Sequence, residues 1–169
     1  MSLEELWYLF PVYLTKPQMC WKKWYLEEES LLKKSISKVD RISHIGSTSI
    51  GSIYDKPIID IGYICMSECA EKISFNKGYT ENGFVEKVFH FHLKYSGNND
   101  EFYFRDYLIE YTNVAREYEK LKLKLCKKYK YNRDAYTSAK TEFVENIHLL
   151  QKINIMIYIS KLQFMGLIV

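Results

Sequence analysis

The sequence lacks the features that mark several large classes of protein. It has only three prolines and seven glycines in 169 residues and no low-complexity stretch, which excludes fibrous repeats and argues against disorder. Lysine and arginine total 24 against 21 acidic residues, so the net charge of +3 gives no concentrated positive surface that would make nucleic acid the default partner. At 47% hydrophobic residues, the chain has the composition of one globular domain with a substantial core.

Cysteines and targeting signals are also scarce. The four cysteines include Cys65 and Cys69, but they lack the second cluster of Cys or His that a structural zinc site requires, so reduced thiols are predicted. The N-terminus has acidic Glu4 and Glu5 where a signal peptide has basic residues, and Pro11 interrupts its short apolar stretch. These features predict a cytoplasmic protein.

The C-terminal segment 153–169 is strongly apolar. Asn154, Lys161 and Gln163 interrupt it, and it is shorter than the roughly twenty apolar residues that cross a bilayer. We therefore expect no membrane association. The segment is predicted to be a tail that either docks on the domain over residues 1–152 or contacts a second copy of the chain, which makes a homodimer a candidate assembly.

The hydrophobic pattern predicts an α+β fold with a helical C-terminal half. Alternating or β-branched stretches predict strands, and helical periodicity predicts helices: strands over 41–45, 57–65 and 85–94, and helices over 101–111, 114–129 and from 133 onward. An earlier helix is predicted to begin near Thr15, with Pro17 in its first turn. Aromatic residues make up 16% of the chain, and most lie on the apolar faces of these elements, so they are predicted to be core.

The most informative segment is the turn at Gly46 and Ser47, between the first two predicted strands. A Gly-Ser turn after a strand presents backbone N–H groups and a hydroxyl to an anion. Further along, Asp60 interrupts an apolar strand, where a carboxylate is costly to bury unless it meets a metal ion, a cation or solvent. Together these residues suggest a phosphate and a metal ion held side by side.

Two histidines on a later strand extend this hypothesis. His90 and His92 alternate with Phe89 and Phe91, so they share the polar face of that strand. If this face turns toward Asp60, a carboxylate and two imidazoles form a ligand set suited to Zn, Mn or Fe, whereas Mg prefers oxygen. The alternative is an exposed strand face that carries two histidines of no special role.

At these residues the sequence resembles the GrpB family of the nucleotidyltransferase fold superfamily. The resemblance runs in order through residues 39–50, 56–61, 90–93, 104–108 and 136–143, most of the chain. It implies a small mixed sheet packed by helices, with Gly46 and Ser47 opening a helix over the phosphates and Asp60 facing the cleft. Active superfamily members carry a second carboxylate two residues later for a two-metal mechanism, and here that position is Gly62.

Three basic residues are candidates for the rim of the same cleft. We expect Lys56, Arg105 and Lys140 to compensate the charge of a phosphate or carboxylate on the ligand. The alternative is that they are structural partners of acidic side chains, with Asp106 and Glu142 as the nearest choices.

The sequence therefore predicts a protein that binds a nucleotide or another phosphorylated small molecule together with a divalent metal ion, Mg²⁺, Mn²⁺ or Zn²⁺. Nucleotidyl transfer is the reaction that the resemblance implies, whereas the missing carboxylate at Gly62 leaves a non-catalytic binding or accessory module as the alternative. The candidate residues are Asp60 and His92 for catalysis, Asp60, His90 and His92 for the metal, and Gly46, Ser47, Lys56, Arg105 and Lys140 for phosphate.

Overall fold

The computed structural model describes residues 1–36, 41–65, 73–95 and 99–165. The elements are α1 (Leu3–Leu9), α2 (Cys20–Ser35), β1 (Arg41–Ile45), the 3₁₀ turn η1 (Ser47–Ser49), β2 (Ile58–Cys65), β3 (Ile73–Thr80), β4 (Gly83–Tyr95), α3 (Asp100–Glu110), α4 (Thr112–Lys128), α5 (Arg133–Ser138) and α6 (Thr141–Phe164). The strands form one mixed sheet in the order β1-β2-β4-β3, in which only the β2–β4 pair is parallel. The predicted α+β class, with a small mixed sheet and a helical C-terminal half, is confirmed.

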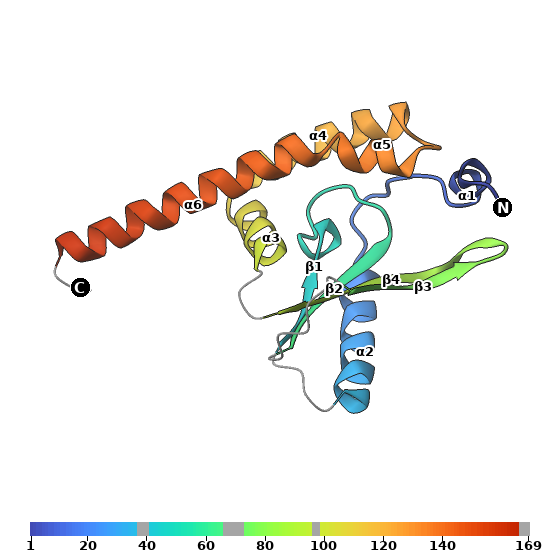
Figure 1. The fold of residues 1–169 in the computed structure, drawn as a ribbon, viewed down its shortest axis with the longest axis horizontal. Coiled ribbons are helices and arrows are strands. Elements are labelled where there is room, and N and C mark those ends of the chain that lie inside the picture. The colour runs from blue at the N-terminus through green and yellow to red at the C-terminus, as the bar shows by residue number, and fades with distance from the viewer. Residues whose placement is uncertain (37–40, 66–72, 96–98, 166–169) are drawn as a thin grey trace.

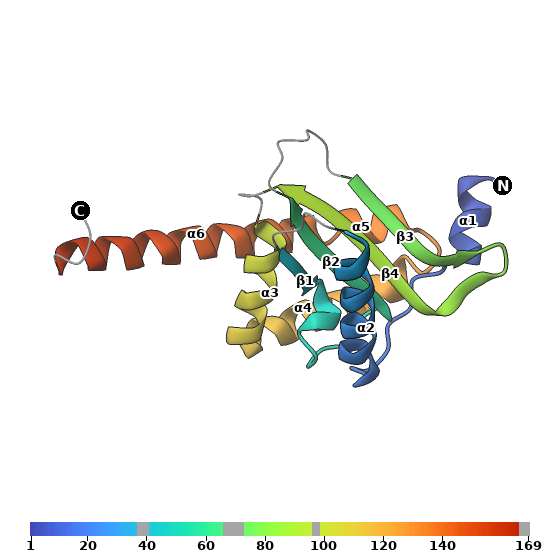
Figure 2. The same ribbon diagram turned by 90° about the horizontal axis from the view of Figure 1, so that it is seen from below.

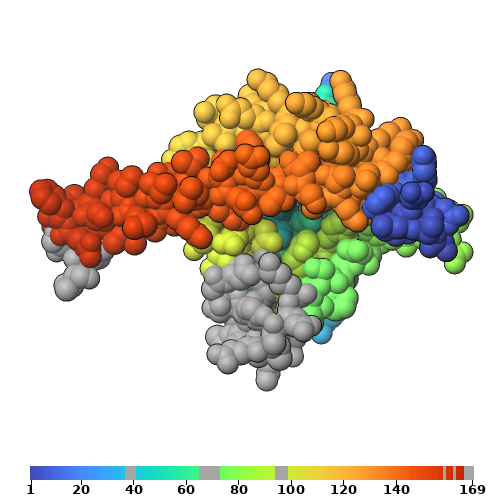
Figure 3. All heavy atoms as spheres, turned by 45° about the horizontal axis from the view of Figure 1, so that its top comes forward, coloured from blue at the N-terminus to red at the C-terminus, as the bar shows by residue number. Residues whose placement is uncertain are grey.

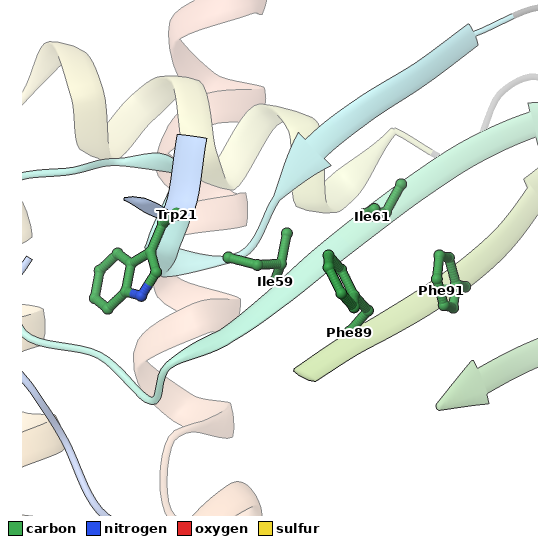
Figure 4. Packing of buried hydrophobic residues seen from close by; sticks show 5 residues of the cluster. All are labelled: Trp21, Ile59, Ile61, Phe89 and Phe91. Atoms are coloured by element: carbon green, nitrogen blue, oxygen red, sulfur yellow. The ribbon is translucent and has the colours of Figure 1, made fainter. Parts of the chain in front are cut away.

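The two faces of the sheet are covered by different helices. The long helix α2 lies on one face, and α4, α5 and α6 lie over the other (Figures 1 and 2). On the α2 side, Trp21 packs with four strand residues that are almost fully buried, shown in Figure 4: Ile59, Ile61, Phe89 and Phe91. Burial of each such side chain is worth about 1.5–3 kcal/mol. Because strand side chains alternate, this core turns the even-numbered residues of β2 and β4 toward the C-terminal helices.

Three local predictions differ from the structure. The helix expected to begin near Thr15 begins at Cys20, because the Thr15 backbone pairs in both directions with Asp55, with N···O distances of 2.8 and 3.1 Å. The edge strand β3 was not predicted, because the alternation of Ile73 and Phe75 with Ser74 and Asn76 ends after four residues, at Lys77 and Gly78. The last predicted helix is divided into α5 and α6 at Ala139 and Lys140.

The C-terminal segment continues α6 without a break at residue 153. The end of this helix projects away from the rest of the molecule (Figures 1 and 3), and the apolar side chains described there are exposed to solvent, with Met156 at 68% and Phe164 at 93% exposure. Asn154 and Ile155 line a hollow beside α3, but the described side chains from Met156 onward are exposed, and contact with a second copy stays a prediction. Residues 166–169 lie outside the described residues. No helix among the described residues is long and apolar enough to cross a membrane.

Candidate metal and anion site

The pairing of β2 with β4 brings one carboxylate and two imidazoles together. Asp60 aligns with His90, and Gly62 aligns with His92, so both histidines project on the same face of the sheet as Asp60. His90 Nδ1 lies 3.3 Å and His92 Nε2 lies 3.1 Å from Asp60 Oδ1. All three candidate ligand atoms lie within 4.8 Å of one another, on side chains that are 16–29% exposed. The sequence prediction that these three residues converge agrees with this geometry.

The spacing of these atoms suits a single metal ion. Ligands bound at about 2.0 Å to a tetrahedral ion stand about 3.3 Å from each other, close to the distances from Asp60 Oδ1 to the two ring nitrogens. Two imidazoles with one carboxylate favour Zn²⁺ or a similar transition ion over Mg²⁺, which prefers oxygen. The residues present therefore fit a metal ion with an open coordination position.

Asp60 is ionised in this arrangement. Burial opposes its ionisation, but hydrogen bonding to His90 and His92 outweighs that effect and holds the pKa of Asp60 well below its usual value. An ionised carboxylate only accepts hydrogen bonds, so His92 Nε2 donates to Asp60 Oδ1 at 3.1 Å. A cation bound here would replace protons on the two imidazoles.

The Gly46 turn closes directly over this carboxylate. Gly46 has a φ of +67°, and a Cβ at this position would stand 3.0 Å from Asp60 Cγ and closer still to Oδ2. The Ser47 side chain is buried and interacts with the hydroxyl of Tyr118. Gly46 and Ser47 do open a helix, but it is only the three-residue 3₁₀ helix η1, which supplies little helix dipole, and its place over a phosphate stays a prediction.

A group of lysines occupies the same side of the sheet. Lys56 Nζ and Lys140 Nζ lie 5.7 and 4.4 Å from the ring centre of the buried Tyr136. Burial lowers the pKa of Lys56, and the charges of Asp60 and Asp55 partly restore it. Burial, followed by the charge of Lys56, lowers the pKa of Lys140 to about 8. Among the described residues, neither lysine forms an ion pair, so neither charge has a carboxylate partner in direct contact.

Arg105 is held elsewhere. Its guanidinium donates to the backbone oxygen of His44 at 2.8 Å and pairs with Asp106 at 2.6 Å. It lines a groove of about 960 Å³ bordered by α2, η1 and α3. The structural alternative considered for Arg105, a salt bridge with Asp106, is therefore what the structure shows, and no described contact joins it to Asp60.

Three further residues belong to the site and were missed from the sequence. Arg133 Nη2 donates to Tyr79 Oη at 2.9 Å, and Tyr79 Oη lies 2.7 Å from His90 Nε2. Lys122 is 1% exposed, and its Nζ lies 3.2 Å from Asp55 Oδ1 without the alignment of a hydrogen bond. A lysine on the apolar stripe of a predicted helix is a signal that could have marked Lys122. The Asn82-Gly83 dipeptide, which is typical of β-hairpin turns, is a signal that could have marked the strand of Tyr79.

Comparison with known proteins identifies the family. The model of the family described as GrpB protein matches residues 11–66 and 61–149 of this sequence. The chain belongs to the GrpB family. The family segments include the turn at Gly46, the strand of Asp60, both histidines, and the lysines at positions 56 and 140.

Individual GrpB relatives agree with this assignment. Glutamate-rich protein GrpB of Alkalihalophilus pseudofirmus is 34% identical over 154 residues, which cover 75% of this chain and 88% of that protein. UPF0157 protein YqkA of Bacillus subtilis is 31% identical over 147 residues, which cover 74% of this chain but only 43% of that protein. The conserved protein GrpB of Enterococcus faecalis shares the fold, with a TM-score of 0.70 at 23% identity over 82% of this chain and 96% of that structure.

Proposed function

We propose that this GrpB protein binds a divalent metal ion at Asp60, His90 and His92 and holds the phosphate of a nucleotide, or of another phosphorylated small molecule, beside that ion. The observation that carries the proposal is the convergence of three ligand atoms within 4.8 Å of one another on one face of the sheet. Bound there, the ion would supply positive charge to a phosphate oxygen. The candidate ions are Mg²⁺, Mn²⁺ and Zn²⁺, of which the two imidazole ligands favour Zn²⁺ or Mn²⁺.

The surrounding charges support an anionic ligand. Lys56 interacts electrostatically with Asp60, Asp55 and Arg133, and Lys140 interacts with the same two carboxylates and with Lys122. Lys122 also interacts with Glu119, so four cations face three carboxylates, and a bound metal ion would enlarge this excess of positive charge. Because uncompensated buried charge is costly, a ligand with two or more negative charges would stabilise the site.

Nucleotidyl transfer is the reaction proposed for this site, with Asp60 on the metal and His92 beside it as the second catalytic group. One observation favours the second candidate, binding without catalysis. A Cβ at Gly62 would lie 3.1 Å from Ile45 Cδ1 and 3.3 Å from Phe102 Cζ. The position that carries a second carboxylate in active nucleotidyltransferases is therefore packed against apolar side chains.

Thermal unfolding tests metal binding. Wild type, Asp60→Asn and the control Asp106→Asn are melted with Zn²⁺, Mn²⁺ or Mg²⁺ in turn. Asp106 is 58% exposed and pairs with Arg105, so its amide should leave the site intact. At one hundred times Kd, a ligand adds about 2.7 kcal/mol, which should raise the Tm of wild type and Asp106→Asn by about 5–10 °C. An equal rise in Asp60→Asn would show that the metal binds elsewhere.

A second set of melts tests the anion. ATP, GTP and inorganic phosphate are added with the metal to wild type and to Lys140→Met. We expect a further rise in Tm for wild type that is reduced in Lys140→Met, while the rise caused by metal alone persists. Release of pyrophosphate from ATP or GTP would support transfer, whereas stabilisation without turnover would support the binding module. A nucleotide effect unchanged in Lys140→Met would contradict the assigned anion site.

A further inference from the structure

A β-bulge in the β3–β4 pairing, where residues 85–88 of β4 stand opposite Gly78 alone, places Tyr79 on the metal side of the sheet. Lys77 pairs with Phe89 and reaches Glu28 on α2 at 2.7 Å, so it projects on the α2 face. In a regular strand the residue two positions later projects on the same face. The register shifts between Lys77 and Tyr79, at Gly78, and Tyr79 lies instead beside His90 on the opposite face.

The bulge requires glycine. Gly78 has a φ of +95°, and a Cβ there would stand 3.0 Å from Val88 Cα and closer still to the backbone oxygen of Lys87. Bulges of this kind re-aim a side chain next to functional sites. Here the side chain that is re-aimed reaches a candidate metal ligand.

Tyr79 links His90 to a cation that can only donate. Arg133 Nη2 donates to Tyr79 Oη at 2.9 Å, so the Tyr79 hydroxyl proton is free to point to His90 Nε2 at 2.7 Å. A neutral His90 that accepts at Nε2 carries its proton on Nδ1, which faces Asp60 Oδ1 at 3.3 Å. In the metal-free protein, Arg133 therefore donates to Tyr79 and Tyr79 donates to His90. His90 in turn directs its Nδ1 proton at Asp60.

A metal ion on His90 Nδ1 would take the place of the proton shared with Asp60 and would reverse the contact between His90 and Tyr79. The imidazole proton would then sit on Nε2 and be donated to Tyr79 Oη, which can accept it while still accepting from Arg133. A hydroxyl serves both states because it can donate and accept, and the side chain of phenylalanine can do neither. Ligating histidines commonly donate their other ring N–H to such a partner, and loss of the partner weakens metal binding about 10–100-fold.

We infer that Tyr79 and Arg133 are positioning residues of the metal site, which hold the His90 ring so that Nδ1 points at Asp60 and a transition ion such as Zn²⁺ can bridge the two. This inference rests on the proposed function, because it assumes that a metal binds at Asp60. It assigns a role to the bulge at Gly78, and it makes Nδ1 the ligating atom of His90.

The test compares Zn²⁺ affinity, measured by competition with a chromophoric chelator, in wild type, Tyr79→Phe and the control Tyr25→Phe. Tyr25 lies on α2, and its hydroxyl bonds Glu29 at 2.9 Å and the backbone oxygen of Ile42 at 3.3 Å, away from the metal. We expect Tyr79→Phe to bind Zn²⁺ about 10–100-fold more weakly and Tyr25→Phe to bind as wild type does. Visible absorption of the Co²⁺-substituted proteins should change in Tyr79→Phe alone, because ring orientation alters the ligand geometry.

A second measurement needs no variant. In metal-free wild type, ¹⁵N NMR should show His90 protonated at Nδ1 and unprotonated at Nε2, and Zn²⁺ should exchange these states. Protonation at Nε2 in the metal-free protein would overturn the inference. If wild type binds Zn²⁺ and Tyr79→Phe binds it equally, this inference fails and the proposed function stands. If wild type binds no Zn²⁺, this inference fails, and the melts with Mn²⁺ and Mg²⁺ decide whether the proposed function stands.

Discussion

The carboxylate of Asp60 packs directly against the Cα of Gly46, so the turn after β1 is in van der Waals contact with the centre of β2. Gly46 adopts φ +67° and ψ 176°, a conformation that is essentially restricted to glycine. The contact explains why a glycine stands beside the carboxylate whether or not the turn binds phosphate. It also provides a sharp test of the site.

Replacing Gly46 by alanine should both destabilise the fold and displace Asp60. Backbone strain of this kind costs about 1–3 kcal/mol, and the new Cβ would in addition push the carboxylate away from the histidines. Urea unfolding and Zn²⁺ titration measure the two effects. Gly51→Ala is the matched control, because Gly51 has φ +71° but the methyl group of an alanine there would have no atom within 4 Å. It should lose stability through strain and keep its metal affinity; equal metal loss in both variants would contradict the contact.

Removing the ammonium group of Lys122 should be strongly destabilising. Lys122→Met leaves Asp55 buried at 10% exposure without its ion-pair partner, and breaking such a pair costs about 3–5 kcal/mol. Denaturant unfolding of Lys122→Met, Asp55→Asn and the double variant measures the coupling, and the double variant should recover part of the loss. Lys87→Met is the control, because Lys87 and Glu27 are 43% and 45% exposed in their pair, so its loss of stability should be much smaller. Similar losses at positions 87 and 122 would contradict this prediction.

Stability should fall in mild acid because of His44. Burial lowers the pKa of His44 to about 4 from an ordinary value of 6.5. Between pH 6.5 and 4 the unfolded chain therefore binds more protons than the folded one, and the free energy of unfolding decreases as pH drops. His44→Gln lacks this titration. Between pH 7 and 4, its free energy of unfolding should therefore fall by up to about 3 kcal/mol less than that of wild type. Parallel curves for the two proteins would show that His44 charges freely in the fold.

Deleting residues 153–169 should leave the fold intact and change the assembly. The apolar side chains that the structure describes beyond Ile153 are exposed, so deletion of this segment should shift the Tm by no more than about 2 °C. If the projecting end of α6 joins two copies, light scattering should give a dimer mass for the full chain and a monomer mass for the shortened one. An unchanged mass would rule out an assembly through the tail.

Much of the fold is encoded in local patterns. The alternation of Phe89 and Phe91 with His90 and His92 determined both the strand and the face that each side chain takes, because strand side chains alternate strictly. Asp60 stood out as a carboxylate in an apolar strand, and the cost of burying a lone charge pointed to a partner. These two patterns predicted the convergence of Asp60 with the histidines.

Other features depend on partners that are distant in sequence. Thr15 is a residue type that commonly caps a helix. Its backbone pairs instead with Asp55, and the helix begins only at Cys20. Arg105 was expected at the phosphate, but the backbone oxygen of His44 holds it in the groove beside α2. Neither contact leaves a local signature, since each joins segments dozens of residues apart.

The glycines show the same division between local sequence signals and contacts set by the tertiary structure. The sequence by itself determined that Gly46 begins a turn beside a functional strand, because glycine after a strand is a local signal. Only the tertiary structure decided that Gly78 forms a bulge which carries Tyr79 to His90, because the meaning of a glycine in an edge strand depends on the register with its neighbour. The pairing of β2 with β4, set by packing against α2, finally decided which side chains share the site.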